Sequence, residues 1–310
     1  MRIEREPFAS RLSDAGVVTI GKFDGVHLGH RAVLGQTVAR ARELGVDAVA
    51  VTFDRNPLAQ LHPEASPPAL VSLERRLELI EETGIDLVAV LEFGAERAAQ
   101  SAEDFVDELL VGRLGARVLL VGVDFRFGAR GQGDVWELRR MGESRGFTVE
   151  LLPAVGGAGV DRISTSGIRA LIAEGRVSEA AARLGSLPAV TGEVVRGNER
   201  GRELGFPTAN LAEDSVGAMP ADGVYAGWLT RAGGERLPAA ISVSDNPTFA
   251  TGDHRRVEAH VLDRDLNLYG EVVTVEFVDR IRGIEKFDSI EALIERMTID
   301  VVQTRDLLDL

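Results

Sequence analysis

The sequence has no cysteine among its 310 residues, and lysine occurs only twice, at Lys22 and Lys286. The lack of cysteine excludes a disulfide framework and thiol chemistry. It fits a reducing compartment, and we therefore expect a cytoplasmic protein. With so little lysine, arginine supplies almost all of the positive charge.

Long apolar runs are also missing, so no segment is expected to cross a bilayer. The first residues, Met1 to Glu6, are mostly charged and show no apolar signal core. The net charge of −14 argues against a nucleic-acid or membrane surface, and we expect neither partner. The length allows two domains, and 45% hydrophobic with 27% charged residues is the composition of a soluble globular protein. The oligomeric state is left open.

Strands and helices are expected to alternate through the first half of the chain. The helices begin at the caps Ser72, Ser101 and Asp134 and end near glycines. Such alternation predicts an α/β domain with a parallel sheet and helices on both faces. The strands are expected at residues 17–20, 47–53, 85–91, 117–121 and 147–152.

The turn between the first strand and the first helix, from Gly21 to His30, reads GKFDGVHLGH. In an open parallel sheet this turn lies at the carboxyl end of the strands, where ligands bind. Gly21 and Gly25 let a ligand approach the backbone, and the free N–H groups of the helix start favour an anion. His27 and His30 can donate hydrogen bonds to phosphate oxygens. The turn therefore predicts a phosphate site.

Three further loops are expected on the same edge of the sheet, at residues 52–57, 122–128 and 163–169. The second loop mixes aromatic, acidic and basic side chains and suits a flat ring beside a phosphate. Its alternative interpretation is that Phe125 and Phe127 are core residues beneath a long loop. The third loop predicts a polyphosphate grip formed by hydroxyls, helix N–H groups and an arginine, and a simple capped helix is compatible with it.

After a linker at residues 185–188 the sequence changes to closely spaced β segments at 190–196, 223–230, 239–243, 256–263 and 271–280. This pattern predicts a small antiparallel barrel. A terminal helix follows, with Asp288 and Glu291 as the expected capping pair and an apolar stripe expected to pack on the barrel. The predicted domains are 1–186 and 187–310.

Within the barrel, the segment from Gly201 to Asn210 reads GRELGFPTAN. Pro207 fixes the chain just before Thr208 and Asn210, whose side chains would share one face of a strand. Two neutral oxygen ligands suit a hydrated Mg²⁺ that also takes phosphate oxygens. The alternative is an ordinary turn and strand.

These motifs also carry a resemblance. The pattern G-x-F-D-G-x-H-x-G-H, with the loops at 52–57, 122–128 and 163–169, resembles the FAD synthetase branch of the nucleotidyltransferase superfamily. The segments 201–210, 246–249 and 257–263 resemble riboflavin kinases. Their order is similar to that of the bacterial bifunctional riboflavin kinase/FAD synthetase family. Two departures stand out: Arg55-Asn56 replaces the usual proline and histidine, leaving the role of Asn56 open, and Thr165-Ser166 reverses the usual order of hydroxyls.

The resemblance implies a Rossmann-like FMN adenylyltransferase domain and a riboflavin kinase-like barrel. The barrel would phosphorylate riboflavin to FMN with ATP and Mg²⁺, and the first domain would adenylylate FMN to FAD with release of pyrophosphate. The implied catalytic residues are Glu258 as general base for the kinase and His27 and His30 for adenylyl transfer.

The implied binding residues fall into four groups. The ATP site of the adenylyltransferase would use Gly21, Phe23, Asp24, Gly25, His27, His30, Ser164, Thr165, Ser166 and Arg169. Its flavin contacts would be Asn56, Asp124, Phe125, Arg126 and Phe127. The kinase nucleotide loop would comprise Gly201, Arg202, Gly205, Phe206 and Pro207, with Thr208 and Asn210 at the metal.

Three rival functions were weighed. The first domain could transfer another nucleotide, as cytidylyltransferases do, but the phenylalanine-rich loop and the kinase-like half argue against this. One of the two activities could have been lost, although no motif looks degraded. A flavin-binding regulator without turnover would be expected to lack Glu258 or the histidine pair, and both are present.

Overall fold

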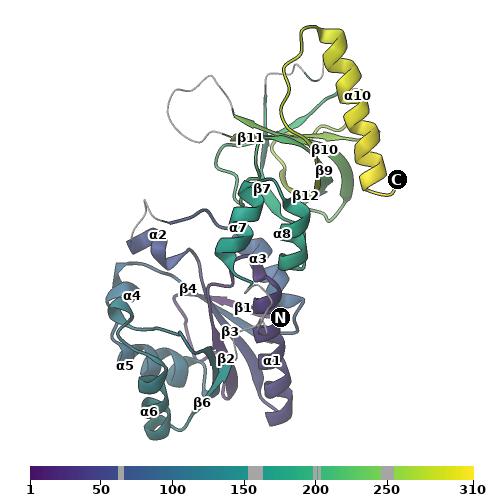
Figure 1. Cartoon of the computed structure of the whole chain (residues 1–310). Helices are drawn as coiled ribbons and strands as arrows, with labels where there is room; N and C mark the ends of the chain where they lie inside the picture. Colours follow the sequence, from purple (N-terminus) through teal and green to yellow (C-terminus); the bar gives the residue numbers. More distant parts are fainter. Residues whose placement is uncertain (62–65, 153–162, 198–200, 202–203, 246–254) are drawn as a thin grey trace. The chain divides into compact units, whose positions relative to one another are not determined.

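The computed structural model (Figure 1) describes residues 1–61, 66–152, 163–197, 201, 204–245 and 255–310. The chain forms two compact units, residues 1–67 with 73–163 and residues 68–72 with 164–310. Each unit is described by itself. The division between functional domains at residues 186 and 187 stays a prediction.

The first unit is built on a six-stranded sheet in the order β1-β4-β3-β2-β5-β6, in which every neighbouring pair is parallel. The predicted α/β class is confirmed. The edge strand β1 was not predicted, because its sequence RIER has no apolar alternation. The strands are β1 (Arg2–Arg5), β2 (Gly16–Ile20), β3 (Asp47–Phe53), β4 (Leu87–Leu91), β5 (Ala116–Gly122) and β6 (Thr148–Leu152).

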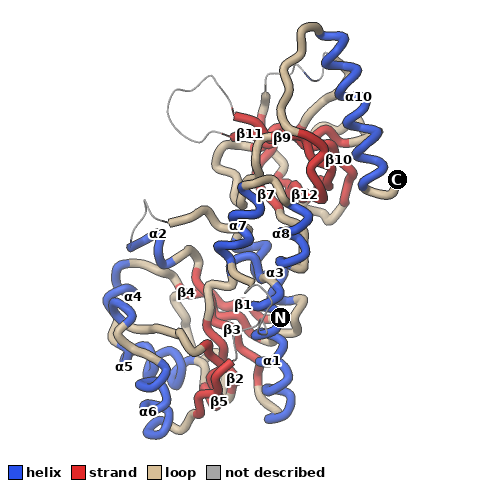
Figure 2. The backbone as a smooth tube through the Cα atoms, viewed as in Figure 1, coloured by secondary structure: helices blue, strands red, loops and turns tan. Residues whose placement is uncertain are grey.

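Helices cover both faces of this sheet (Figure 2). Neighbouring residues of a strand enter opposite cores: Val17 packs with α1 and α3, whereas Val18 packs with η3 and α6. The helices are η1 (Asp24–Val26), α1 (Leu28–Leu44), α2 (Pro57–Leu61), α3 (Leu73–Glu81), α4 (Ala95–Ala99), α5 (Ala102–Asp104), the π-helix η3 (Phe105–Arg113), η4 (Ala129–Gly131) and α6 (Val135–Arg145).

The strand order reverses at β2. From β2 the chain moves to β3 and β4 on one side and then returns to β5 on the other. Ligands of open α/β sheets bind outside the carboxyl ends of the strands at such a switch point. The histidine turn follows β2 and the loop 122–128 follows β5, so both flank this position.

The second unit holds a closed barrel in the order β10-β11-β8-β7-β12-β9, and the predicted antiparallel barrel is confirmed. Its core includes Tyr225 and Phe277, whose rings meet edge to face at 5.4 Å. The strands are β7 (Ala189–Val195), β8 (Ala209–Leu211), β9 (Gly223–Arg231), β10 (Arg236–Asp245), β11 (Arg255–Val261) and β12 (Val272–Arg282).

The described residues of this unit also form the helices α7 (Thr165–Ala173), α8 (Val177–Leu184) and α10 (Ile290–Leu307). The expected cap of the terminal helix was wrong, because Ser289, not Asp288, accepts the N–H of Ala292 at 3.1 Å. The helix packs on the barrel as predicted. Its most buried side chains, however, are the polar Asp300 and Thr304. No described helix of either unit is long and apolar enough to span a membrane.

Candidate active sites

The histidine turn is held in an unusual backbone conformation. Phe23, Gly25 and Val26 all have positive φ, at 47°, 76° and 41°. Side-chain-bearing residues seldom adopt this region, and such strain tends to gather at functional sites. The turn delivers His27 to the N-cap of α1 and places His30 in its first turn, as predicted.

The two histidines form a stacked pair. Their ring centroids lie 3.7 Å apart with an interplanar angle of 14°, and Phe23 packs edge-on against His30. His27 Nδ1 accepts the backbone N–H of His30 at 3.2 Å. A neutral His27 must therefore carry its proton on Nε2, which leaves Nε2–H as a donor for a ligand.

Both imidazoles are neutral at physiological pH. Burial lowers the pKa of His27, a shift that a hydrogen bond to its own backbone and the charge of Asp24 only partly offset. Burial, assisted by His27 and Arg76, lowers the pKa of His30 to about 3. The pair can thus donate hydrogen bonds to phosphate without carrying charge.

Arg76, on α3, is a residue that the sequence analysis missed. Its side chain is buried (6% exposed) against the strand ends beside the histidine turn, and its charge acts on His30. An arginine within a helix is ordinarily predicted to face solvent, so the sequence offers no signal for its burial.

Both the oxygen and the nitrogen of the Asn56 side-chain amide have a partner in the structure. Its Oδ1 accepts the N–H of Leu58 at 3.1 Å, in the first turn of α2, and its Nδ2 lies 3.5 Å from Ser66 Oγ. Asn56 thus stabilises the start of α2. A flavin contact by Asn56 stays a prediction.

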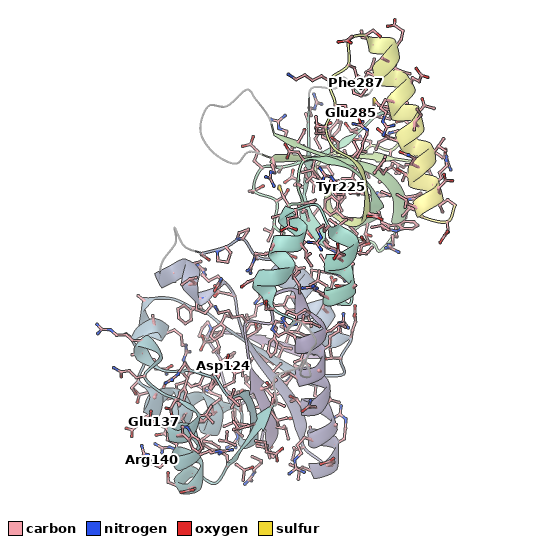
Figure 3. All side chains as sticks on the ribbon, viewed as in Figure 1. Asp124, Glu137, Arg140, Tyr225, Glu285 and Phe287 are labelled. Atoms are coloured by element: carbon pink, nitrogen blue, oxygen red, sulfur yellow. The ribbon has the colours of Figure 1, made fainter. Side chains whose placement is uncertain are left out.

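The loop after β5 divides into exposed and buried members. Asp124, labelled in Figure 3, is exposed, and Arg126 is exposed and lies 3.8 Å from Asp134. Phe127 is 5% exposed and packs in the core, where Phe125 stacks on it at 5.7 Å. Phe127 is therefore a core residue, as the alternative interpretation of this loop has it. The residues better placed to meet a ligand are Asp124, Phe125 and Arg126.

The hydroxyl motif starts α7, which belongs to the second compact unit. Ser164 Oγ accepts the N–H of Gly167 at 3.2 Å, as a capping residue does. Thr165 and Ser166 form the first turn, and Arg169 Nε donates to Pro68 O at 2.8 Å. The cap is as predicted, and the phosphate grip remains a proposal.

The barrel brings Glu258, Asn210 and Thr208 together. Glu258 of β11 is directly opposite Asn210 of β8 in the antiparallel register. Thr208 Oγ1 lies 3.5 Å from Glu258 Oε2 and 3.2 Å from Asn210 Nδ2. Burial raises the pKa of Glu258, against the hydrogen bond from Thr208 and the charge of Arg256. A half-buried carboxylate of raised pKa beside neutral oxygens is a suitable proton acceptor.

The loop that leads to Thr208 is held by short backbone contacts. Phe206 N donates to Gly201 O at 2.8 Å, and a Cβ on Gly201 would lie 2.4 Å from Phe206 O, so only glycine fits there. His260 Nδ1 lies 2.8 Å from Pro207 O, and since a carbonyl only accepts, Nδ1 carries the proton. Gly205 has a φ of 87°. Arg202 lies outside the described residues.

Two cavities meet at Thr208. One, of about 280 Å³, is largely polar and is lined by Arg196, Asn210 and Tyr269, among others. The other, of about 320 Å³, is mainly apolar and contains Glu258. Its apolar wall was not predicted as a site and comes from the segment after β12 and from α10: Ile284, Phe287, Leu293, Met297 and Val301. Phe287 is labelled in Figure 3.

Each compact unit thus holds a candidate site: the histidine pair lies in the first, and Glu258 with Thr208 and Asn210 lies in the second. Two sites of different chemistry on one chain are typical of a bifunctional transferase. A family model described as FAD synthetase matches residues 10–167, and one described as riboflavin kinase matches residues 184–308. The chain belongs to the bifunctional riboflavin kinase/FMN adenylyltransferase family.

Named relatives agree with this assignment. The Escherichia coli K12 bifunctional riboflavin kinase/FMN adenylyltransferase is 35% identical, over 95% of this chain and 93% of its own. The protein of that name from Pseudomonas fluorescens is 36% identical, over 94% and 92%. A crystal structure titled as a macrolide-efflux protein from Streptococcus pneumoniae superposes with a TM-score of 0.84 at 30% identity, covering 98% of this chain and 99% of its own.

Proposed function

We propose that this chain makes FAD in two steps, phosphorylating riboflavin to FMN in the barrel and adenylylating FMN through the histidine turn. The observation that carries the first step is the meeting of a polar and an apolar cavity at Thr208, beside the half-buried carboxylate of Glu258. The polar cavity would take ATP and the apolar one the flavin ring. The lack of cysteine fits a cytoplasmic setting for both steps.

In the kinase step a riboflavin hydroxyl oxygen attacks the γ-phosphorus of ATP, and the bond to the bridging oxygen of ADP breaks. The hydroxyl proton passes to Glu258, whose raised pKa suits this transfer. His260 holds the carbonyl of Pro207 and so supports the segment that presents Thr208.

Mg²⁺ fits this site as a shared ion. No group of three or more His, Asp or Glu side chains that could hold a metal occurs in the described part of the chain. Thr208 Oγ1 and Asn210 Oδ1 are the neutral oxygens that would bind a Mg²⁺ carried by ATP, as this ion retains water and phosphate ligands. When bound, it would neutralise charge on the phosphates.

In the adenylylation step a phosphate oxygen of FMN attacks the α-phosphorus of ATP, and pyrophosphate leaves. The nucleophile is already an anion, so this step needs alignment and charge stabilisation, not a base. His27 Nε2–H and the start of α1 can bind phosphate oxygens, while Ser164, Thr165, Ser166 and Arg169 would contact the pyrophosphate. Asp124, Phe125 and Arg126 are assigned to the flavin.

The test is a time course of products from purified protein with riboflavin, ATP and Mg²⁺, separated by chromatography. FMN should appear first and then give way to FAD. The His30→Ala variant should accumulate FMN, and the Glu258→Gln variant should convert only added FMN. Full FAD synthesis by the His30→Ala protein would contradict the assignment of the histidine turn.

A further inference from the structure

Arg76 lies on the buried face of α3, where its neighbours Leu77, Leu79 and Ile80 are apolar. The adjacent Arg75 has the ordinary placement, with a side chain 28% exposed and paired to Glu78 at 2.8 Å. Burying a guanidinium among apolar residues costs free energy unless its donors are satisfied and its charge is compensated. The contacts of Arg76 show where this side chain acts.

One guanidinium nitrogen connects the ends of two strands. Arg76 Nη1 lies 3.0 Å from Lys22 O, 3.2 Å from Thr52 Oγ1 and 2.9 Å from Phe53 O. Lys22 follows β2 within the histidine turn, and Phe53 ends β3. Arg76 therefore fixes the turn to the neighbouring strand.

The charge of Arg76 lacks a direct counterion in the described structure. Its three acceptors are neutral oxygens, and among the residues described no carboxylate forms an ion pair with it; its buried Nε has no partner there either. Asp24, Asp54 and Glu74 act on it only at longer range. Arg76 thus places a positive charge without a direct ion-pair partner beneath the turn, where it can stabilise a bound polyphosphate.

We propose that Arg76 is a positioning residue for adenylyl transfer, which fixes the carbonyl of Lys22 and supplies a permanent positive charge under the bound triphosphate. This inference rests on the proposed adenylyltransferase function. It explains how His27 and His30 can remain neutral donors: a buried arginine supplies the charge. His30 is surrounded by His27 and Phe23 from the turn and by Arg76 from α3.

The test compares Arg76→Met, Arg76→Lys and the exposed control Arg75→Met in the full chain, with FMN and ATP as substrates. We expect Arg76→Met to lower kcat/KM for ATP about 10²-fold, and Arg76→Lys to recover at least about tenfold of that loss because it keeps the charge. Arg75→Met should match the unaltered protein. Thermal unfolding of each variant beside the unaltered protein reports whether the first compact unit, which contains Arg76, is folded.

A further readout separates charge from mere packing. NMR titration should show the pKa of His30 rising in Arg76→Met and staying low in Arg76→Lys, since only the former removes the neighbouring cation. Equal losses in both variants, or unchanged kinetics in Arg76→Met, would overturn the proposal. If Arg76→Met fails to fold, Arg76→Gln takes its place, because its amide can still donate to the carbonyl of Lys22 but carries no charge. Unchanged kcat/KM for ATP in Arg76→Gln would refute the role. If the unaltered protein makes no FAD from FMN, the proposed function itself fails.

Discussion

At the scale of single residues, Glu258 is the side chain whose surroundings most clearly specify its chemistry. We expect Glu258→Gln to lower the kcat of riboflavin phosphorylation about 10²- to 10⁴-fold and to leave FMN adenylylation unchanged. Since burial raises the pKa of Glu258, kinase activity should be lost as pH falls through that raised pKa, because the protonated carboxyl cannot accept a proton. The pH–rate profile of kcat checks this, and the acid limb should vanish in the Gln variant.

His30, unlike Glu258, is expected to keep the same protonation state when the pH is lowered. An exposed imidazole titrates near pH 6.5, whereas the pKa of His30 is about 3. We therefore expect the ring of His30 to remain neutral on acidification to pH 5, as measured by imidazole ¹⁵N chemical shifts. The His30→Ala protein assigns the resonance. A titration midpoint near 6.5 would mean that the ring is solvated, contrary to the stacked geometry.

Sequence reasoning found the residues that carry local motifs and missed those brought in from elsewhere. His27, Thr208 and Asn210 lie in contiguous patterns whose chemistry can be judged from spacing, whereas Glu258 was assigned through the resemblance to riboflavin kinases. Arg76 could not be found in this way, because its burial depends on how α3 packs against the ends of β2 and β3. The apolar wall of the cavity beside Glu258 depends likewise on α10 meeting the barrel.

At the scale of elements, caps and glycines located the helices well. Asp134 accepts the N–H of Glu137 at 2.9 Å and Gly146 ends the same helix with a φ of 81°, as their sequence positions predict. The charged strand β1 was missed because it shows no apolar pattern. The strand expected around Thr208 and Asn210 exists as β8, but it begins only at Ala209. The predicted cap of α10 was wrong by one residue. Asp288 and Ser289 are both good capping residues, and the backbone conformation decides which of them caps the helix.

The terminal helix offers a prediction about what holds the apolar cavity beside Glu258 together. Arg282 Nη2 of β12 lies 2.7 Å from Asp300 Oδ2 of α10, and the Asp300 side chain is only 5% exposed. Asp300→Asn should destabilise the barrel by about 3–5 kcal/mol, since it leaves a buried guanidinium unpaired. It should also raise KM for riboflavin, because Asp300 lines the apolar cavity.

The matched control is Asp263→Asn, which removes an exposed ion pair between this helix and the turn after β11. The side chains of Arg305 and Asp263 are 36% and 69% exposed. An exposed pair of this kind is worth about 1 kcal/mol or less, so the control should unfold almost as the unaltered protein does. Denaturant unfolding of the two variants measures the contrast, and equal destabilisation would show that burial of the Arg282 pair is unimportant.

At the scale of the whole molecule, the two proposed sites share no residue, so each activity should be lost without the other. This predicts complementation between chains: a mixture of Glu258→Gln and His30→Ala proteins should convert riboflavin to FAD, although neither does so alone. The His30→Ala chain would release FMN, and the Glu258→Gln chain would adenylylate it. Chromatography of the mixture, with each variant alone as control, measures the result.

The time course of that mixture tests how FMN moves between the steps. If FMN travels through solution, the lag before FAD appears should shorten as the concentration of the Glu258→Gln chain rises, because transfer is then bimolecular. It should also lengthen when an unrelated FMN-binding protein is added as a trap. A further outcome is that free FMN accumulates and no FAD forms, although the Glu258→Gln chain still adenylylates FMN added at high concentration. This would show that the FMN released by the His30→Ala chain stays too dilute to be used. FAD formation insensitive to the trap would instead require transfer within an assembly of the two variants.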